Sequence, residues 1–199
     1  MKKSLFTFLS ICLVTSYAAF GGSNTSSLLT NEVEPMFFEG DKVISVGLGL
    51  GTTLYSGRYY NTKVPPVSVS FELGVEDDFL TEDMTLGVGG YVGYASSEYK
   101  WRHANWGWNY TYIVVGGRGA LHYPIVENID TYAGVMMGLN IVLSSEFGDG
   151  AGDISASGSG LIYGLYGGAR YYFSEDIAFM AELGYGIAYL TIGISLKLP

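Results

Sequence analysis

The C-terminal stretch from Ile177 to Leu198 alternates between apolar residues and small or polar residues with a period of two. Apolar side chains occupy the odd positions from Ile177 to Tyr185, and after Gly186 the even positions from Leu190 to Leu198. This period is typical of β-strands with one apolar face, because successive side chains point to opposite sides of a sheet. The stretch therefore predicts two strands joined as a hairpin.

The second face of these two strands consists mostly of small residues, Thr and Tyr, and its charged residues are Glu182 and Lys197. The exterior of a soluble barrel would carry many Lys and Glu side chains. Small and polar residues instead suit the crowded interior of a small barrel whose apolar outer face contacts lipid. The pattern therefore favours a transmembrane barrel, with the apolar side chains pointing outward.

The same alternation recurs through most of the chain and predicts eight strands. The expected strands are residues 42–53, 67–75, 84–94, 112–123, 131–141, 161–172, 177–185 and 190–198. Long connections (55–66, 96–109 and 144–160) alternate with short ones (77–83, 124–128 and 174–176). Pro65 and Pro66 are expected outside the sheet, because proline cannot donate a ladder hydrogen bond. We expect an all-β fold, an eight-stranded antiparallel up-and-down transmembrane β-barrel over residues 42–199, with the long loops outside the cell.

The composition agrees with an exported membrane barrel. A chain of 199 residues predicts one domain, and 15% charged against 48% hydrophobic residues is poor in charge for a soluble domain. Beyond the N-terminus there is no run of 18 apolar residues, which argues against helical membrane spans. The formal net charge of -9 argues against nucleic-acid binding, which requires a basic surface.

Residues 1–18 have the features of a signal peptide. Lys2 and Lys3 precede an apolar core from Leu5 to Val14, and small residues predict cleavage after Ala18. Loss of the two lysines would change the net charge from -9 to -11. The one cysteine, Cys12, would leave with the signal peptide, which excludes disulfides and cysteine-based metal sites from the mature chain.

Residues 19–41 are expected to be a flexible N-terminal segment, because they lack a hydrophobic period. Within it, the trio from Met36 to Phe38 is either a docking patch or a group of side chains tucked against the near end of the barrel.

Two internal runs, VGGRGALHYP and GLYGGARYYFSEDIAFMAELGYG, resemble sequences of the small eight-stranded outer-membrane barrels of the OmpA and OmpX type. This resemblance implies a barrel in the outer membrane of a Gram-negative bacterium. In the last strand, Thr191, Gly193, Leu196 and Leu198 have the spacing of the C-terminal signal read by the barrel assembly machinery, which implies that machinery as a partner. Such recognition has a physical basis in pairing of a strand whose backbone groups are still unpaired.

Four charged residues fall on the inward faces of the expected strands: Glu72, Arg118, Arg170 and Glu182. A charge on the lipid face near the bilayer midplane would cost about 2 to 4 kcal/mol, so the inward placement supports the assigned orientation. We expect a salt-bridge cluster in the lumen, with Arg170 and Glu182 close together across the sixth and seventh strands. The alternative is a gate or a narrow charged pore, although eight strands leave room for little more than side chains.

Aromatic residues concentrate in and next to the second long connection, and we single out Trp101, Trp106, Trp108 and Tyr110. Amphipathic rings at headgroup depth form the aromatic girdle of membrane proteins, which is the expected role of this aromatic rim. The alternative is a binding surface for an extracellular protein or glycan.

No constellation predicts catalysis or metal binding. His103 and His122 are expected near opposite rims and lack the spacing of a metal pair, and no serine follows His122 closely. Asp149 and Asp153 supply too few ligands for Ca²⁺. The sequence therefore predicts a protein without enzymatic activity, cofactor or metal.

The predicted function is that of an integral outer-membrane protein with a structural or surface-interaction role, in adhesion or in the envelope, whose partners include outer-membrane lipid. Three alternatives remain open: a narrow porin or transporter of small ions or hydrophobic molecules, a lipid A-modifying enzyme, and a secreted soluble carrier similar to a lipocalin.

Overall fold

The computed structural model describes residues 33–199 apart from residues 56, 101–105 and 149–154, and the side chains of residues 155–157 are not described. The expected signal peptide (1–18) and residues 19–32 of the N-terminal segment therefore lie outside the described residues. The same holds for Trp101, His103, Asp149 and Asp153. Within the described part, no helix has the length and hydrophobicity needed to cross a membrane.

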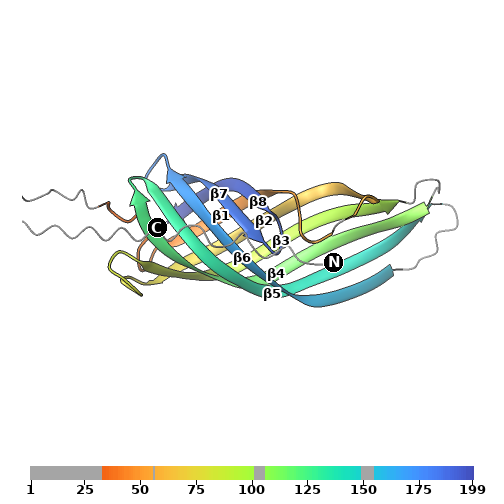
Figure 1. Ribbon diagram of the computed structural model, residues 1–199, viewed down its shortest axis with the longest axis horizontal. Helices are drawn as coiled ribbons and strands as arrows, with labels where there is room; N and C mark the ends of the chain where they lie inside the picture. The colour runs from red at the N-terminus through yellow and green to blue at the C-terminus, as the bar shows by residue number, and fades with distance from the viewer. Residues whose placement is uncertain (1–32, 56, 101–105, 149–154) are drawn as a thin grey trace, which may run out of the picture. The chain divides into compact units, whose positions relative to one another are not determined.

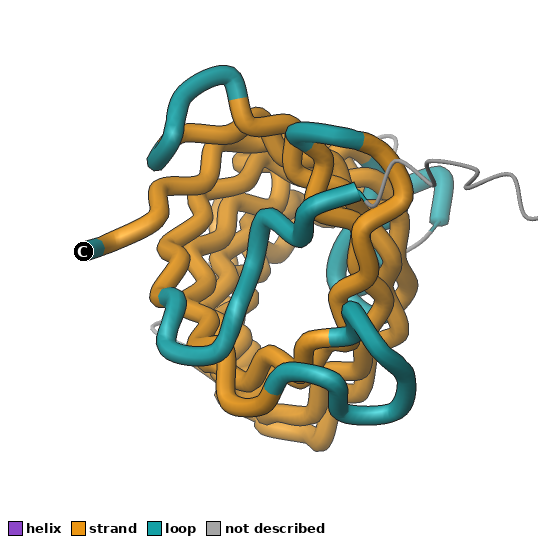
Figure 2. Tube along the Cα trace, turned by 90° about the vertical axis from the view of Figure 1, so that its left-hand side faces the viewer, coloured by secondary structure: helices purple, strands orange, loops and turns teal. Residues whose placement is uncertain are grey.

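Eight antiparallel strands close into one barrel, which confirms the expected fold (Figures 1 and 2). The strands are β1 (Lys42–Leu50), β2 (Tyr60–Glu76), β3 (Thr85–Lys100), β4 (Trp106–Val126), β5 (Ile129–Gly148), β6 (Ser155–Tyr172), β7 (Ile177–Tyr185) and β8 (Leu190–Leu198). The ring is closed between β1 and β8, which pair from Lys42 with Leu198 to Leu50 with Leu190. We call the end that carries Lys42 and Leu198 the near end, and the opposite end the far end.

The strands have unequal lengths. β1, β7 and β8 contain 9 residues each, whereas β2 to β6 contain between 16 and 21. A tilted strand crosses a bilayer with about 9 to 11 residues, so the five long strands continue past the membrane at the far end. Figure 1 shows them running on to the right, beyond the short strands. The long connections expected at residues 55–66, 96–109 and 144–160 are therefore largely strand.

Pro65 and Pro66 lie inside β2, which corrects the expectation that they stand outside the sheet. The pairing of β1 with β2 ends at Leu48 and Val67, so both prolines lie on a part of β2 that β1 does not reach. The pairing of β2 with β3 also shifts between Val64 and Val67. An edge and a bulge are the positions where a strand tolerates a missing N–H.

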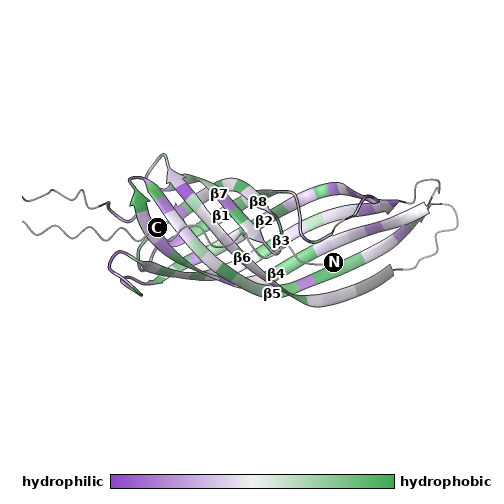
Figure 3. Ribbon diagram, in the orientation of Figure 1, coloured by the Kyte–Doolittle hydropathy of each residue, from purple (hydrophilic) through white to green (hydrophobic). Residues whose placement is uncertain are grey.

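The outer face of the barrel is apolar and the inner face holds the polar and charged groups. Outward side chains stay exposed, for example 56% at Val46, 41% at Phe71 and 52% at Ile194. Inward polar side chains are buried, among them Ser45, Glu72, Arg170 and Ser195 at 2% exposure or less. Figure 3 shows the hydrophobic residues as green bands along the strands. A soluble protein has the opposite distribution, with polar side chains outside and apolar side chains inside. Contact with lipid requires the distribution seen here.

Residues 33–41 pack against the near end. Phe37 is 1% exposed, whereas its neighbour Phe38 is 43% exposed. Two backbone hydrogen bonds fix the segment to β2: Gly40 N–H donates to the Gly74 carbonyl, and Gly74 N–H donates to the Asp41 carbonyl. Of the two readings of the trio from Met36 to Phe38, the structure agrees with the one that tucks it against the barrel.

Candidate functional site

The near-end half of the lumen contains a buried ionic layer of four residues on four strands. Arg170 on β6 donates to Glu72 on β2 and, over 3.0 Å, to Asp130 Oδ2 on β5. His122 on β4 lies between the two acids, with 2.7 Å from Nδ1 to Asp130 Oδ1 and 3.2 Å from Nε2 to Glu72 Oε1. The side chains of all four are 3% exposed or less.

The geometry of this layer favours a doubly protonated His122. Both ring nitrogens face carboxylate oxygens, and an ionised carboxylate only accepts hydrogen bonds. With both carboxylates ionised, both nitrogens carry a proton and the ring is an imidazolium. Two cations, Arg170 and His122, then balance two anions, Glu72 and Asp130, and this balance is what burial of charge requires.

Two members of the ionic layer were not among the four charges expected in the lumen. His122 belongs to the inward series of the expected fourth strand, and the structure confirms that it points inward, where it is 2% exposed. Its inward position follows from its even spacing from Arg118, which is also inward. Asp130 was not singled out, although it continues the inward series of β5 by one step from Tyr132.

An aromatic ring covers the ionic layer from the near end. The ring of Phe37 stacks on His122 with 4.1 Å between centroids, and the Thr85 hydroxyl donates to the Phe37 carbonyl over 3.1 Å. Lys197 on β8 donates to the Met36 carbonyl and pairs with Asp41 over 2.7 Å. The segment before β1 thus closes the near end and contacts the last strand.

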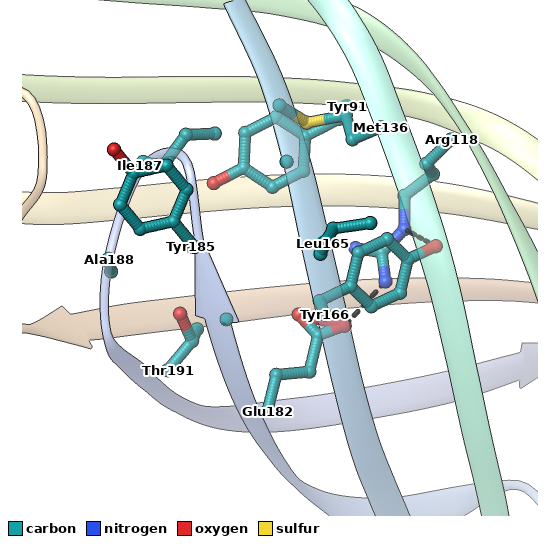
Figure 4. Close-up of a pocket in the computed structure, with 12 residues that line it drawn as sticks. Tyr91, Arg118, Met136, Leu165, Tyr166, Glu182, Tyr185, Ile187, Ala188 and Thr191 are labelled. Carbon is teal, nitrogen blue, oxygen red and sulfur yellow. Dashed lines mark hydrogen bonds and ion pairs between the residues drawn. The ribbon is translucent and has the colours of Figure 1, made fainter. Parts of the chain in front are cut away.

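A second ion pair lies farther up the lumen. Arg118 pairs with Glu182 over 2.5 Å, and its Nε donates to the Tyr166 hydroxyl over 2.9 Å (Figure 4). The guanidinium carbon also lies 3.9 Å from the centre of the Tyr166 ring. Tyr132 donates to the same carboxylate oxygen of Glu182 over 3.1 Å.

The expected pairing of Arg170 with Glu182 is wrong. The register of β6 and β7 places Glu182 opposite Gly168, and Arg170 opposite Met180. Arg118 reaches Glu182 across the lumen from β4, while Arg170 turns to Glu72 and Asp130. The structure thus brings all four expected charges into the lumen, but in two separate groups.

An apolar layer fills the far-end half of the lumen. Ile187 and Ala188, in the turn between β7 and β8, are each 9% exposed, and Ile187 packs with Val114 and Met136. Thr53 N–H and the Thr52 hydroxyl both donate to the Ile187 carbonyl, which ties this turn to the segment after β1.

A small cavity remains between the apolar layer and the second ion pair. Its volume is about 40 Å³, and Tyr91, Met136, Arg118 and Ile187 are among its lining residues (Figure 4). A water needs roughly 10 to 15 Å³ on this scale, so the cavity has room for about three. Side chains thus occupy the lumen at three levels: the ionic layer under Phe37, the second ion pair, and the apolar layer.

The expected aromatic rim does not form a girdle. Trp106, Trp108 and Tyr110 lie in β4 at even positions, the series that places Arg118 and His122 in the lumen, and the pairing of β4 with β3 has no register shift there. These residues therefore belong to the inner, concave side of the projecting sheet and not to the lipid face. The alternation of inward and outward side chains along β4 continues in the part of the strand that projects beyond the membrane.

Tyrosines from four segments gather on this concave side. We call Tyr55, Tyr60, Tyr99, Tyr110 and Tyr112 the far-end tyrosine cluster. Ring centroids are 5.2 Å apart for Tyr60 and Tyr99, 6.0 Å for Tyr60 and Tyr110, and 5.5 Å for Tyr55 and Tyr112. Tyr112 is buried and the other four are partly exposed, so the cluster offers rigid aromatic surface with hydroxyl groups.

Other aromatic residues have the position of membrane girdles. Tyr185 and Tyr189, 60% and 55% exposed, flank the far-end turn of the short strands β7 and β8. At the near end, Phe173 and Phe179 are 49% and 57% exposed and lie 4.7 Å apart. Aromatic rings at both ends of an apolar surface mark the two membrane interfaces.

The four residues with assembly-signal spacing lie in β8. Leu196 and Leu198 belong to its outward series, and Thr191 and Gly193 to its inward series. β8 pairs with β1 on one side and with β7 on the other. Its backbone is thus occupied in the closed barrel, so that any recognition of this strand by pairing would have to precede closure.

These features define the class of the protein. A closed ring of eight strands, an apolar outer face between two aromatic belts and a lumen that holds the buried charges make it a transmembrane β-barrel of the type found in bacterial outer membranes. Barrels of this type have short turns on the periplasmic side, so we expect the near end to face the periplasm.

No protein-family model and no curated protein sequence matches the chain. Among solved structures, it is similar to Ail, the attachment invasion locus protein of Yersinia pestis, in a complex with the heparin analogue sucrose octasulfate. The identity is 15% and the TM-score is 0.47, and the comparison covers 80% of this chain and 96% of Ail. It is similar to the Neisserial surface protein NspA, with 12% identity, a TM-score of 0.46 and coverage of 80% and 98%. It is also similar to the N-terminal barrel domain of Pseudomonas aeruginosa OprF, with 15% identity and a TM-score of 0.44. That comparison covers 81% of this chain and 98% of the OprF domain. The class assignment rests on the barrel's own geometry.

Proposed function

We propose that this outer-membrane barrel is a non-enzymatic, non-conducting surface protein whose far-end sheet contacts an extracellular protein or glycan. The observation that carries the proposal is the projection of β2 to β6, which exceed a span of about 11 residues by roughly 5 to 10. At about 3.3 Å per residue, this corresponds to roughly 15 to 35 Å of strand beyond the lipid. A barrel that served only as an anchor has no need of such a sheet.

The far-end tyrosine cluster supports a contact role. Tyrosine supplies a large, rigid and amphipathic surface at a low cost in conformational entropy, which is why it is frequent in binding surfaces. The cluster lies on the concave side of the projecting sheet, where lipid does not reach. Partial exposure of Tyr60, Tyr99 and Tyr110 leaves ring surface for a partner.

The contents of the lumen argue against the two alternatives that need it. A narrow porin or transporter would have to displace the three levels of side chains. A lipid A-modifying enzyme would need a nucleophile activated by a base, but both nitrogens of His122 are held by carboxylates under Phe37.

We also propose how the chain reaches the membrane. Residues 1–18 act as an export signal that is removed after Ala18, and residues 19–32 remain as a flexible lead. The barrel assembly machinery then reads Thr191, Gly193, Leu196 and Leu198 before β8 pairs with β1. The paired state of β8 in the closed barrel supports this order of events.

The proposal predicts that shortening the projecting sheet removes binding and leaves the barrel intact. Asn140 pairs with Gly160, so residues 141–159 can be replaced by an Asn-Gly turn that removes the projecting part of β5 and β6 and preserves their hairpin. We expect cells with the full-length protein to bind a component of a glycan array or an extracellular-matrix protein coat, and the shortened variant to bind about tenfold less or weaker.

The control for this experiment is heat modifiability on a gel, which should be the same for both proteins. Equal binding by the two proteins, or absence of binding by the full-length protein, would contradict the surface role. Stepwise conductance of the purified protein in planar bilayers would favour the pore instead.

A further inference from the structure

The far-end part of β2, residues 60–66, has a strand neighbour on one side. The pairing of β1 with β2 ends at Leu48 and Val67, so this part pairs with β3 alone among the described strands. Its pairing with β3 is irregular, because the register shifts between Thr62 and Val64 and again between Val64 and Val67. Hydrogen bonds to a single neighbour, interrupted by two shifts, give this end of β2 weak support.

Tyr60, at the tip of this stretch, lies directly opposite Tyr99 of β3. Their ring centroids are 5.2 Å apart, and the ring planes form an angle of 62°. Residues directly opposite each other have Cβ atoms about 4.5 to 5.5 Å apart, so the sheet keeps the two rings together. Each ring can turn about its Cβ–Cγ bond, because this torsion is broad in tyrosine. An ortho carbon of one phenol can therefore meet an ortho carbon of the other.

Tyr60 also lies at the centre of the far-end tyrosine cluster. Its ring centroid is 5.7 Å from that of Tyr55 and 6.0 Å from that of Tyr110, and the neighbouring Tyr59 lies 6.0 Å from Tyr99. Tyr59 is 36% exposed, and Tyr60 and Tyr99 are partly exposed. Because the far end is expected outside the cell, an oxidant in the medium meets several phenols next to one another.

We propose that the far-end tyrosine cluster is a site of oxidative cross-linking, in which Tyr60 and Tyr99 become a dityrosine. The oxidant is hydrogen peroxide activated by a peroxidase. Each phenol gives up one electron and one proton, and the peroxide takes up both electrons and both protons and leaves as two water molecules. The two phenoxyl radicals combine through a carbon–carbon bond between ortho carbons. The hydrogen atom on each of these carbons then moves to the phenol oxygen, so that both aromatic rings and both hydroxyl groups are restored.

The cross-link stabilises the projecting sheet where its hydrogen bonds give weak support. A bond between Tyr60 and Tyr99 fixes the tip of β2 to β3 and closes the loop of chain between the two residues. A covalent closure of this kind stabilises a fold by restricting the unfolded chain, as a disulfide does. The proposed mature chain has no cysteine, so a disulfide cannot supply this brace. The inference goes beyond the proposed contact role and does not depend on the partner that the sheet contacts.

The test compares Tyr60→Phe with Tyr163→Phe in the full-length barrel, with a single barrel in each nanodisc. Tyr60→Phe keeps the ring and removes the phenol that the reaction needs, whereas Tyr163→Phe removes a 70% exposed phenol of β6 outside the cluster. After treatment with a haem peroxidase and hydrogen peroxide, dityrosine is followed by its fluorescence, and mass spectrometry of proteolytic peptides identifies the linked residues. We expect the unsubstituted protein and Tyr163→Phe to give the linked Tyr60–Tyr99 peptide. Tyr60→Phe should lose this peptide and most of the fluorescence.

Equal dityrosine in Tyr60→Phe and the unsubstituted protein would overturn the inference, as would its absence from both. Links that form only between other tyrosines, or only between two copies of the chain, would overturn it too. If Tyr60→Phe fails to give a heat-modifiable barrel, Tyr99→Phe replaces it, because it removes the other phenol of the pair.

Intact cells provide the second arm of the test. A peroxidase does not cross the outer membrane, so we expect the Tyr60–Tyr99 link to form when the enzyme and peroxide are added outside the cells. A link that forms in nanodiscs but not on cells would overturn the placement of this site on the cell surface.

Discussion

Replacement of Arg170 by methionine should lower the free energy of unfolding of the barrel by about 3 to 5 kcal/mol. Arg170 is 1% exposed and contacts both acids of the ionic layer, so its loss leaves two carboxylates with one imidazolium in the lumen. Removal of one partner from a buried ion cluster leaves a charge without compensation, and this is what makes the change costly. Urea unfolding in lipid vesicles, followed by tryptophan fluorescence, measures the effect.

The matched control is the double variant Arg170→Met with Glu72→Met. It leaves Asp130 with the His122 imidazolium, which is a neutral pair held at 2.7 Å. We therefore expect the double variant to be more stable than Arg170→Met alone. A double variant as unstable as the sum of the two single variants would show that charge balance does not govern this layer.

Replacement of Gly193 by alanine should prevent closure of the barrel. A Cβ at Gly193 would lie 2.1 Å from the carbonyl oxygen of Val46 on β1, and backbone of a paired strand cannot move aside as a side chain can. Overpacking at a site this tight exceeds the usual cost of about 1 to 3 kcal/mol, so the refolded fraction should fall at least about tenfold. The fraction is read from the heat-modifiable band after refolding into detergent.

The control for this prediction is Gly160→Ala, because a Cβ at Gly160 would meet nothing within 4 Å. Refolding in detergent involves no assembly machinery, so a loss there reports on the seam between β1 and β8 and not on recognition of the last strand. Equal refolding yields for the two variants would contradict the steric account.

The strands and their inward and outward faces could be predicted because lipid imposes a strict rule on each residue. Glu72, Arg118, Arg170 and Glu182 were placed inward correctly, since a charge on the lipid face carries a large energetic cost. The two-residue alternation then extends each assignment along its strand.

The ion pairs inside the lumen could not be predicted, because they depend on the register between the strands around the barrel. Arg118 and Glu182 are 64 residues apart in the chain and lie on strands that are not neighbours. Arg170 and Glu182 were expected close together because they lie on adjacent strands. That expectation left out contacts across the lumen, which cannot be inferred from spacing in the sequence.

The projecting sheet was missed because water on both sides removes the apolar signal. Residues 144–148 and 155–160 are rich in Ser and Gly and were expected in a loop, yet they belong to β5 and β6. In β4 a signal was present: Trp106, Trp108, Tyr110 and Tyr112 recur at every second position. This period could have identified both the strand and the common side of the four rings.

The outward orientation of the apolar side chains is the central claim, and spin labels test it most directly. The proposed mature chain has no cysteine, so single cysteines can be placed at Leu48, Phe71 and Ile194 on the outer face and at Glu82 in the exposed turn between β2 and β3. In lipid vesicles, labels at the first three should collide mainly with dissolved oxygen and hardly with a water-soluble nickel chelate, unlike the label at Glu82. Preferential collision of the three outer labels with the chelate would contradict a membrane-spanning barrel.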